Sequence, residues 1–242
     1  MTSPPGPNVP RTHRIVGIIG GMGPEATVDL MRRVIAKTPA RDDQDHAHLL
    51  IESNPKIPSR VAHLIAGTGR DPTPELVRIA QNLEAAGADA LAMPCNTAHA
   101  YAQSIREAVR IPFIDMVQLT VARLAQLKVV RVGLLASSAV HQVHLYQDAL
   151  AANGMTAVEP RQQAQVMELI IAVKRGDIGA EAQARLGSLA AGFSQEADLL
   201  LIACSELSVI AAGMRVPFLD SLEVLADEIV HFTGTHSPAA MR

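Results

Sequence analysis

Short runs of consecutive apolar residues alternate along the chain with longer segments in which apolar residues recur every three or four positions. In the first half, such runs predict strands at residues 15–20, 47–51, 89–93 and 111–114. Helices are predicted between them, one beginning at Pro24 after a glycine-rich break and another at 74–86. Continuously apolar strands that alternate with helices are typical of parallel sheets covered on both faces.

The second half of the chain repeats this order. Its pattern predicts strands at 131–135 and 199–202, and helices at 140–153, 162–174 and 180–193. The spacing repeats too, because Asp89 stands six residues before Cys95 and Asp198 stands six residues before Cys204. Each half also closes with a similar segment, IPFID at 111–115 and VPFLD at 216–220. This agreement predicts a duplicated open α/β unit with a crossing point near residues 115–130.

We therefore expect an α/β protein with two pseudo-symmetric, open parallel-sheet domains and an active site in the cleft between them. The predicted parts are a first lobe at 14–115 with a C-terminal helix at 221–232, a second lobe at 116–220, and flexible tails at 1–13 and 233–242. Ligands of open α/β sheets bind beyond the carboxyl ends of the strands, which is where both cysteines are predicted to lie.

The composition excludes several classes of partner. Apolar residues make up 48% of the 242 residues and the formal net charge is -3, so no broad basic surface is expected for nucleic acid. No apolar stretch is long enough to predict a membrane span. The first ten residues hold four prolines and no apolar block, which indicates a disordered lead-in rather than a signal peptide. A cytoplasmic protein with free thiols is the resulting expectation.

The two cysteines at matched strand ends carry the chemical prediction. A thiolate near the start of a helix is stabilised by backbone N–H groups and the helix dipole, which can lower its pKa. Two thiols on opposite sides of a ligand suit removal of a proton from one face of a carbon and its delivery to the other. Such a two-base inversion needs no metal or redox cofactor when the site stabilises the carbanion electrostatically.

The glycine-rich segment at 20–24 (GGMGP) permits close approach of a ligand to the backbone beside a helix start, which suits an anion. It matches neither the dinucleotide-binding nor the P-loop pattern, so no nucleotide is predicted. Two histidine pairs, His46 with His48 and His141 with His144, lack acidic or cysteine partners at ligand-like spacing, so no metal is predicted either. His99 either tunes the Cys95 thiol or caps a helix.

Four segments together resemble the aspartate/glutamate racemase family, most closely its aspartate racemase branch. They are VGIIGGMGPEATVDL at 16–30, ESNP at 52–55, MPCNTAH at 93–99 and ACSEL at 203–207. The resemblance extends from about residue 14 to residue 231. It implies a cofactor-independent amino-acid racemase, usually a homodimer, that acts on a small-molecule amino acid.

The resemblance also implies roles for particular residues. Cys95 and Cys204 match the catalytic acid and base. The matched substrate-binding positions are Asn96, Thr97, Ser205 and Glu206 for the α-carboxylate and amino group, Met22 and Asn54 as lining, Arg60 and Lys174 for a distal carboxylate, and Ser138 in the loop after strand 131–135. Without the family, Arg60 is a loop cation and Lys174 a solvated residue at a helix end.

The chain departs from the family pattern in two places. Residues 136–140 read ASSAV where many members have Ala-Thr-Thr-Gly-Thr, which removes a hydroxyl and adds bulk near the expected ligand. Ala203 and Ser205 stand where Gly and Thr are common. These changes are compatible with the two-cysteine chemistry, but they leave the identity of the substrate undetermined.

The predicted reaction is interconversion of L- and D-aspartate. Glutamate or a broader set of amino acids is an alternative, because one methylene changes binding by only about 1–3 kcal/mol. Rival interpretations are a maleate isomerase or a malonate decarboxylase of the same superfamily, and a non-catalytic amino-acid-binding protein.

Overall fold

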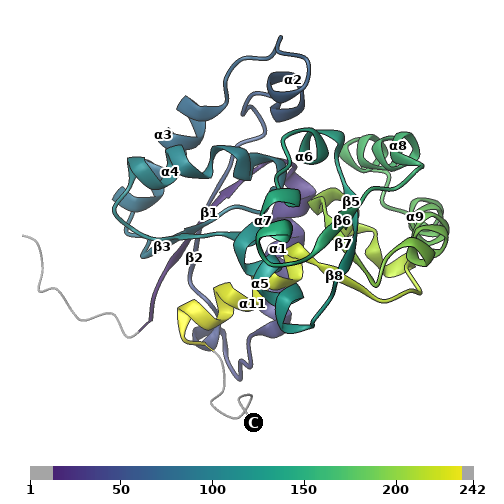
Figure 1. Cartoon of the computed structure of the whole chain (residues 1–242). Helices are drawn as coiled ribbons and strands as arrows, with labels where there is room; N and C mark the ends of the chain where they lie inside the picture. The colour runs from purple at the N-terminus through teal and green to yellow at the C-terminus, as the bar shows by residue number, and fades with distance from the viewer. Residues whose placement is uncertain (1–12, 236–242) are drawn as a thin grey trace, which may run out of the picture.

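The computed structural model describes residues 13–235, which form two lobes, each built on one four-stranded parallel sheet (Figure 1). The first sheet has the order β2-β1-β3-β4 and the second the order β6-β5-β7-β8, so both follow the same topology. The strands are β1 (Val16–Gly20), β2 (Leu49–Ser53), β3 (Ala90–Ala92), β4 (Phe113–Ile114), β5 (Arg131–Ala136), β6 (Thr156–Val158), β7 (Leu199–Ala203) and β8 (Phe218–Asp220). The predicted fold class of two matching α/β lobes is confirmed.

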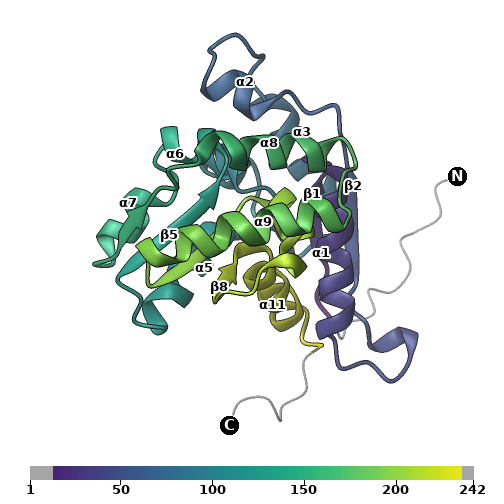
Figure 2. The same cartoon turned by 90° about the vertical axis from the view of Figure 1, so that its right-hand side faces the viewer.

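Helices flank both sheets (Figures 1 and 2). They are α1 (Pro24–Lys37), α2 (Arg60–Leu64), α3 (Thr73–Ala85), α4 (Ala102–Ala108), α5 (Met116–Gln126), α6 (Ser138–Gln142), α7 (Gln147–Ala152), α8 (Gln163–Lys174), α9 (Ala180–Phe193), α10 (Ser205–Val209) and α11 (Ser221–Thr233). The single helix predicted at 140–153 is wrong, because α6 and α7 are separate and His144 between them has a φ of 52°. That backbone conformation does not continue a right-handed helix.

The aspartate repeated six residues before each cysteine has the same structural role in both lobes. The Asp89 carboxylate accepts a hydrogen bond from the Ile15 N–H at 2.7 Å, just before β1. The Asp198 carboxylate accepts one from the Arg131 N–H, also at 2.7 Å, at the start of β5. The duplicated motif therefore joins the start of the central strand to the segment that leads into the cysteine-bearing strand.

The C-terminal helix returns to the first lobe. Apolar residues of α11, including Leu222, Leu225 and Ile229, lie in one buried cluster with Val16 and Ile18 of β1. Figure 2 shows α11 beside α1. Of the predicted tails, only residues 13 and 233–235 fall within the described part of the chain. None of the helices within residues 13–235 has the length and apolar character needed to cross a membrane.

One arginine joins α1 to the segments that carry the second cysteine and the C-terminal helix. The Arg33 guanidinium contacts the carboxylates of Asp220 at 2.8 Å and Glu223 at 2.9 Å, and it donates to the Ser208 carbonyl at 3.2 Å. Burial raises the pKa of Asp220, and the charge of Arg33 opposes that effect. The buried carboxylate therefore depends on its cationic partner.

Replacing Arg33 with methionine is expected to lower the free energy of unfolding by about 3 kcal/mol, because the buried Asp220 carboxylate loses its partner. Urea unfolding of the variant measures this. Arg185→Met is the control, since Arg185 pairs with Glu168 on the exposed surface, and it is expected to cost less than about 1 kcal/mol. Equal costs for the two variants would contradict this role for Arg33.

Candidate active site

Both cysteines line one small cavity between the lobes, with a volume of about 30 Å³. The lining residues of the first lobe are Met22, Ser59, Arg60, Val61, Cys95 and Thr97, and those of the second are Ser137, Met167, Ile170, Lys174, Cys204 and Glu206. The cavity adjoins a wider hollow of about 450 Å³, which shares Met22, Arg60, Lys174 and Glu206 with it. A space of 30 Å³ holds about one water molecule, so a larger ligand must move lining side chains apart.

Each cysteine follows a strand and precedes a helical turn. Cys95 comes three residues after the end of β3 and is 6% exposed. Cys204 directly follows β7, is the N-cap residue of α10 and is 5% exposed. The same topology in the two lobes thus brings both thiols to the carboxyl ends of their sheets, where the cavity lies.

Cys204 has a charged neighbour within its own segment. Its thiol donates to Glu206 Oε2 at 3.2 Å, and the other oxygen of that carboxylate lies 3.6 Å from Lys174 Nζ. Burial, followed by the charge of Glu206, raises the pKa of the Cys204 thiol well above its usual value, while the charge of Lys174 lowers it. A lowered pKa at the helix start is therefore a wrong expectation for Cys204, which holds its proton at neutral pH.

His99 binds backbone groups on both sides of its ring. Its Nε2 accepts from the Met116 N–H at 3.2 Å, so the proton is on Nδ1, which donates to the Cys95 carbonyl at 2.9 Å. Burial lowers the pKa of His99, which keeps the ring neutral. The histidine thus connects the backbone of Cys95 to the first residue of α5.

The cations assigned to a distal carboxylate both line the cavity. Arg60, the first residue of α2, donates to the Pro58 carbonyl at 3.1 Å, while its buried Nε has no hydrogen-bond partner among residues 13–235. Lys174, at the end of α8, lies beside Glu206, and both residues line the cavity. Thr97 is hydrogen-bonded to Ser137 of the second lobe at 3.1 Å between their hydroxyl oxygens.

Four of the predicted substrate-binding residues do not line the cavity: Asn54, Asn96, Ser138 and Ser205. Asn54 donates to Glu75, and the Ser138 hydroxyl accepts from Gln163. The side chains of Asn96 and Ser205 are buried and hydrogen-bonded to residues of the opposite lobe or of α11. Their side chains thus join protein segments rather than line the cavity.

Five lining residues were absent from the sequence prediction: Ser59, Val61, Ser137, Met167 and Ile170. The sequence contains a signal for two of them. Met167 and Ile170 stand seven and four residues before Lys174, so the three residues share one face of a helix. Ser137 could also have been predicted, because it directly follows the strand β5. In the structure it caps α6, where its side chain accepts a hydrogen bond from the Val140 N–H.

The departure at 136–140 does not place bulk in the cavity. Ala139 and Val140 are fully buried, and Val140 belongs to the apolar core of the second lobe. The extra methyl groups therefore contribute to lobe packing rather than to the shape of the site.

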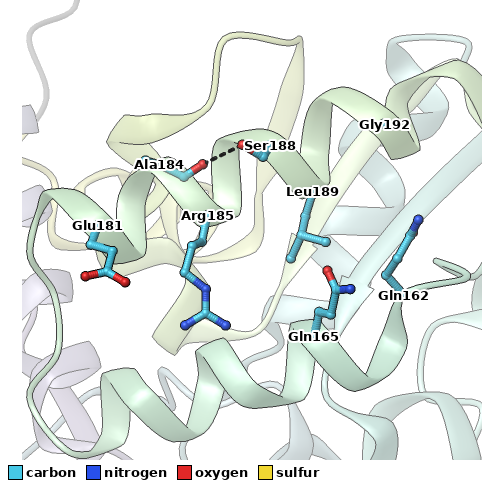
Figure 3. Close-up of a pocket in the computed structure, with 8 residues that line it drawn as sticks. All are labelled: Gln162, Gln165, Glu181, Ala184, Arg185, Ser188, Leu189 and Gly192. Carbon is cyan, nitrogen blue, oxygen red and sulfur yellow. Dashed lines mark hydrogen bonds between the residues drawn. The ribbon is translucent and has the colours of Figure 1, made fainter.

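A second hollow of the structure contains no cysteine. The hollow in Figure 3 has a volume of about 490 Å³ and lies between α8 and α9 of one lobe, where Gln165, Arg185 and Ser188 line it and no thiol is present. Among residues 13–235, no cluster of three or more His, Cys, Asp or Glu residues is arranged to hold a metal ion.

Comparisons with known proteins find amino-acid racemases among the proteins similar to this chain. The family described as Asp/Glu/hydantoin racemase matches residues 19–229. A broad specificity amino-acid racemase, RacX, from Bacillus subtilis is 29% identical over 223 residues, which cover 89% of this chain and 96% of that protein. The structure of Picrophilus torridus aspartate racemase is 32% identical with a TM-score of 0.85, covering 91% of this chain and 94% of that one. A Bacillus anthracis glutamate racemase shares the fold at 17% identity and a TM-score of 0.66, covering 94% and 85%.

The charges beside Cys204 predict opposite effects of two substitutions. In a Cys95→Ala background, Glu206→Gln is expected to lower the pKa of Cys204 and speed its alkylation by iodoacetamide at neutral pH, because a negative neighbour is lost. Lys174→Met is expected to slow it, and each unit of pKa change corresponds to about a tenfold change in thiolate fraction. Alkylation followed by mass spectrometry measures both rates. A change in the same direction for the two variants would refute the assignment.

The burial of His99 predicts a pH dependence of stability. Its folded pKa lies below the unfolded value, so the unfolded chain binds a proton that the folded protein does not, and stability falls as pH drops below about 6.5. One proton contributes a slope of up to about 1.4 kcal/mol per pH unit. In His99→Gln, the loss of stability between pH 7 and pH 5 in urea unfolding is expected to be smaller. An unchanged loss would count against this assignment.

Proposed function

We propose that this chain, which belongs to the Asp/Glu/hydantoin racemase family, interconverts L- and D-aspartate with two thiols as acid and base. Family membership makes the protein an isomerase, an amino-acid racemase. The observation that carries the proposal is that Cys95 and Cys204, from different lobes, line the same cavity.

The charges of the cavity support an acidic amino acid as substrate. Its lining includes two cations, Arg60 and Lys174, and one carboxylate, Glu206. Aspartate has two carboxylates and one ammonium group, so the signs and numbers of charge are complementary. In this arrangement the cations bind carboxylates and Glu206 exchanges its contact with Lys174 for the substrate ammonium group.

The surroundings of Cys204 support a starting role for it as the proton donor. Cys204 holds its proton, which makes it the donor in the first half of the cycle. The Cys95 thiolate removes the α-proton from one face, and Cys204 delivers its own proton to the other face of the carbanion. Cys95 is then a thiol and Cys204 a thiolate, the state required for the reverse direction. Arg60 and Lys174 stabilise the negative charge that the substrate gains.

Aspartate is the first choice among acidic substrates. A solved structure that is 32% identical over most of the chain is an aspartate racemase, and Ala139 and Val140, where this chain departs from the family pattern, add no bulk to the cavity. A relative at 29% identity is a broad specificity racemase, so glutamate and other amino acids belong in the substrate panel. We also propose that the reaction is cofactor-independent, that the protein is a homodimer and that it is cytoplasmic.

The deciding experiment incubates each enantiomer of aspartate and glutamate with the protein in deuterated water. Optical rotation and α-deuterium incorporation are followed for the wild type, Cys95→Ser and Cys204→Ser. We expect racemisation of aspartate by the wild type and a loss of at least about 100-fold in each variant, since a general acid or base contributes 10²–10⁴-fold. Thr235→Ser, which does not line the cavity, is the control for the effect of preparing a variant, and it is expected to racemise aspartate like the wild type.

Three results would reject the proposal. Full racemisation by either single-cysteine variant would exclude a two-base mechanism. Turnover of a malonate or a maleate without exchange at an amino-acid α-carbon would favour a decarboxylase or an isomerase of other acids. Tight amino-acid binding without exchange, undisturbed by alkylation of the thiols, would identify a non-catalytic binding protein.

A further inference from the structure

We infer that Ser205 is a positioning residue whose hydroxyl fixes the gap between the two catalytic thiols, an inference that rests on the proposed racemase function. The Ser205 hydroxyl donates to the Pro94 carbonyl at 2.8 Å. Pro94 directly precedes Cys95, and Ser205 directly follows Cys204. A single hydrogen bond between the lobes therefore joins the immediate neighbours of both thiols.

This bond limits how far apart the two cysteines can be. With a length of 2.8 Å and standard covalent geometry on either side, it holds the two Cα atoms to a separation of at most about 12 Å. Each sulfur lies one side chain beyond its Cα, so the bond also sets an upper limit on the space between two facing thiols. Loss of the bond leaves the contacts made by Asn96 and Thr97 to hold the Cys95 segment to the second lobe.

The bond is placed to be strong. Ser205 is 1% exposed, so water does not compete for the Pro94 carbonyl. A buried hydrogen bond that loses one partner leaves the other unsatisfied, at a cost of about 1–3 kcal/mol. Because the peptide group that accepts the bond is the one that joins Pro94 to Cys95, any shift of this carbonyl moves the Cys95 backbone directly.

The two residues that follow Cys95 are hydrogen-bonded to other segments as well. Asn96 donates to the Ser221 hydroxyl at 3.1 Å and accepts from the Tyr146 hydroxyl at 2.6 Å. Thr97 is hydrogen-bonded to Ser137 at 3.1 Å. The Cys95 segment is thus held along its length, whereas Ser205 is the residue that ties it to the Cys204 segment.

Ser205 is placed to position thiols rather than to bind substrate. Its hydroxyl proton is used on Pro94, and the residue does not line the cavity, although its neighbours Cys204 and Glu206 both do. If the Ser205 side chain bound the substrate, its loss would lower the affinity for the substrate. A positioning residue affects the rate of proton transfer, which is sensitive to displacements of the reacting groups of about 1 Å.

The test compares Ser205→Ala, Ser205→Thr and Ser208→Ala for racemisation kinetics of aspartate and for unfolding in urea. We expect Ser205→Ala to lower kcat by about 10- to 100-fold with KM changed less than about twofold. Ser205→Thr keeps the hydroxyl and is expected to retain most of the activity. Ser208→Ala removes a buried hydroxyl from the same short helix, where it binds Asp220 at 2.7 Å, and is expected to lose stability but keep kcat.

The outcomes separate this inference from the proposed function. A wild-type kcat in Ser205→Ala, a raised KM with unchanged kcat, or an equal loss of kcat in Ser208→Ala would overturn the positioning role while leaving the racemase intact. A folded Ser205→Thr that is as slow as Ser205→Ala would overturn it too. A wild-type protein that exchanges no amino-acid α-proton would instead reject the proposed function itself.

Discussion

The site depends on holding the carboxyl ends of two separate sheets against each other. Cys95 and Cys204 belong to different lobes, and neither sheet alone can place a group on both faces of a ligand. Buried and partly buried polar contacts hold the lobes together: Ser205 with Pro94, Asn96 with Tyr146, and the Arg33 guanidinium with Asp220. Buried hydrogen bonds of this kind lose free energy when either partner is removed, so they resist separation of the lobes.

Duplication of the fold is not matched by duplication of the chemistry. The aspartates before each cysteine bind the start of the central strands in the same way. The residues after each cysteine differ, since Glu206 accepts the Cys204 proton whereas His99 donates to the Cys95 backbone. One lobe therefore offers a thiol that is hydrogen-bonded to a carboxylate, and no such carboxylate follows the thiol of the other lobe. A symmetric scaffold with unequal thiols suits a reaction in which one group begins as acid and the other as base.

The architecture was predictable because it is encoded locally. Continuous apolar strands, Pro24 at a helix start and the repeated spacing to Cys95 and Cys204 gave the two lobes and the position of both thiols at strand ends. The turn at 143–146 between α6 and α7 was not predicted, because the apolar pattern does not signal the positive φ of His144. Neither were the roles of Asn96 and Ser205, whose partners lie in segments more than 40 residues away. Hydrogen bonds between side chains of different lobes leave no periodic pattern in a single sequence, so they could not be predicted from it.

The most direct measurement is a crystal structure of the Cys95→Ser, Cys204→Ser variant with L-aspartate bound, since this variant keeps both side-chain positions and removes the reactive thiols. We predict that the α-carbon lies between the two serine hydroxyls, on opposite faces and within about 3.5 Å of each, the separation needed for proton transfer. Aspartate bound with both hydroxyls on one face, or bound outside the cavity between the lobes, would contradict the account.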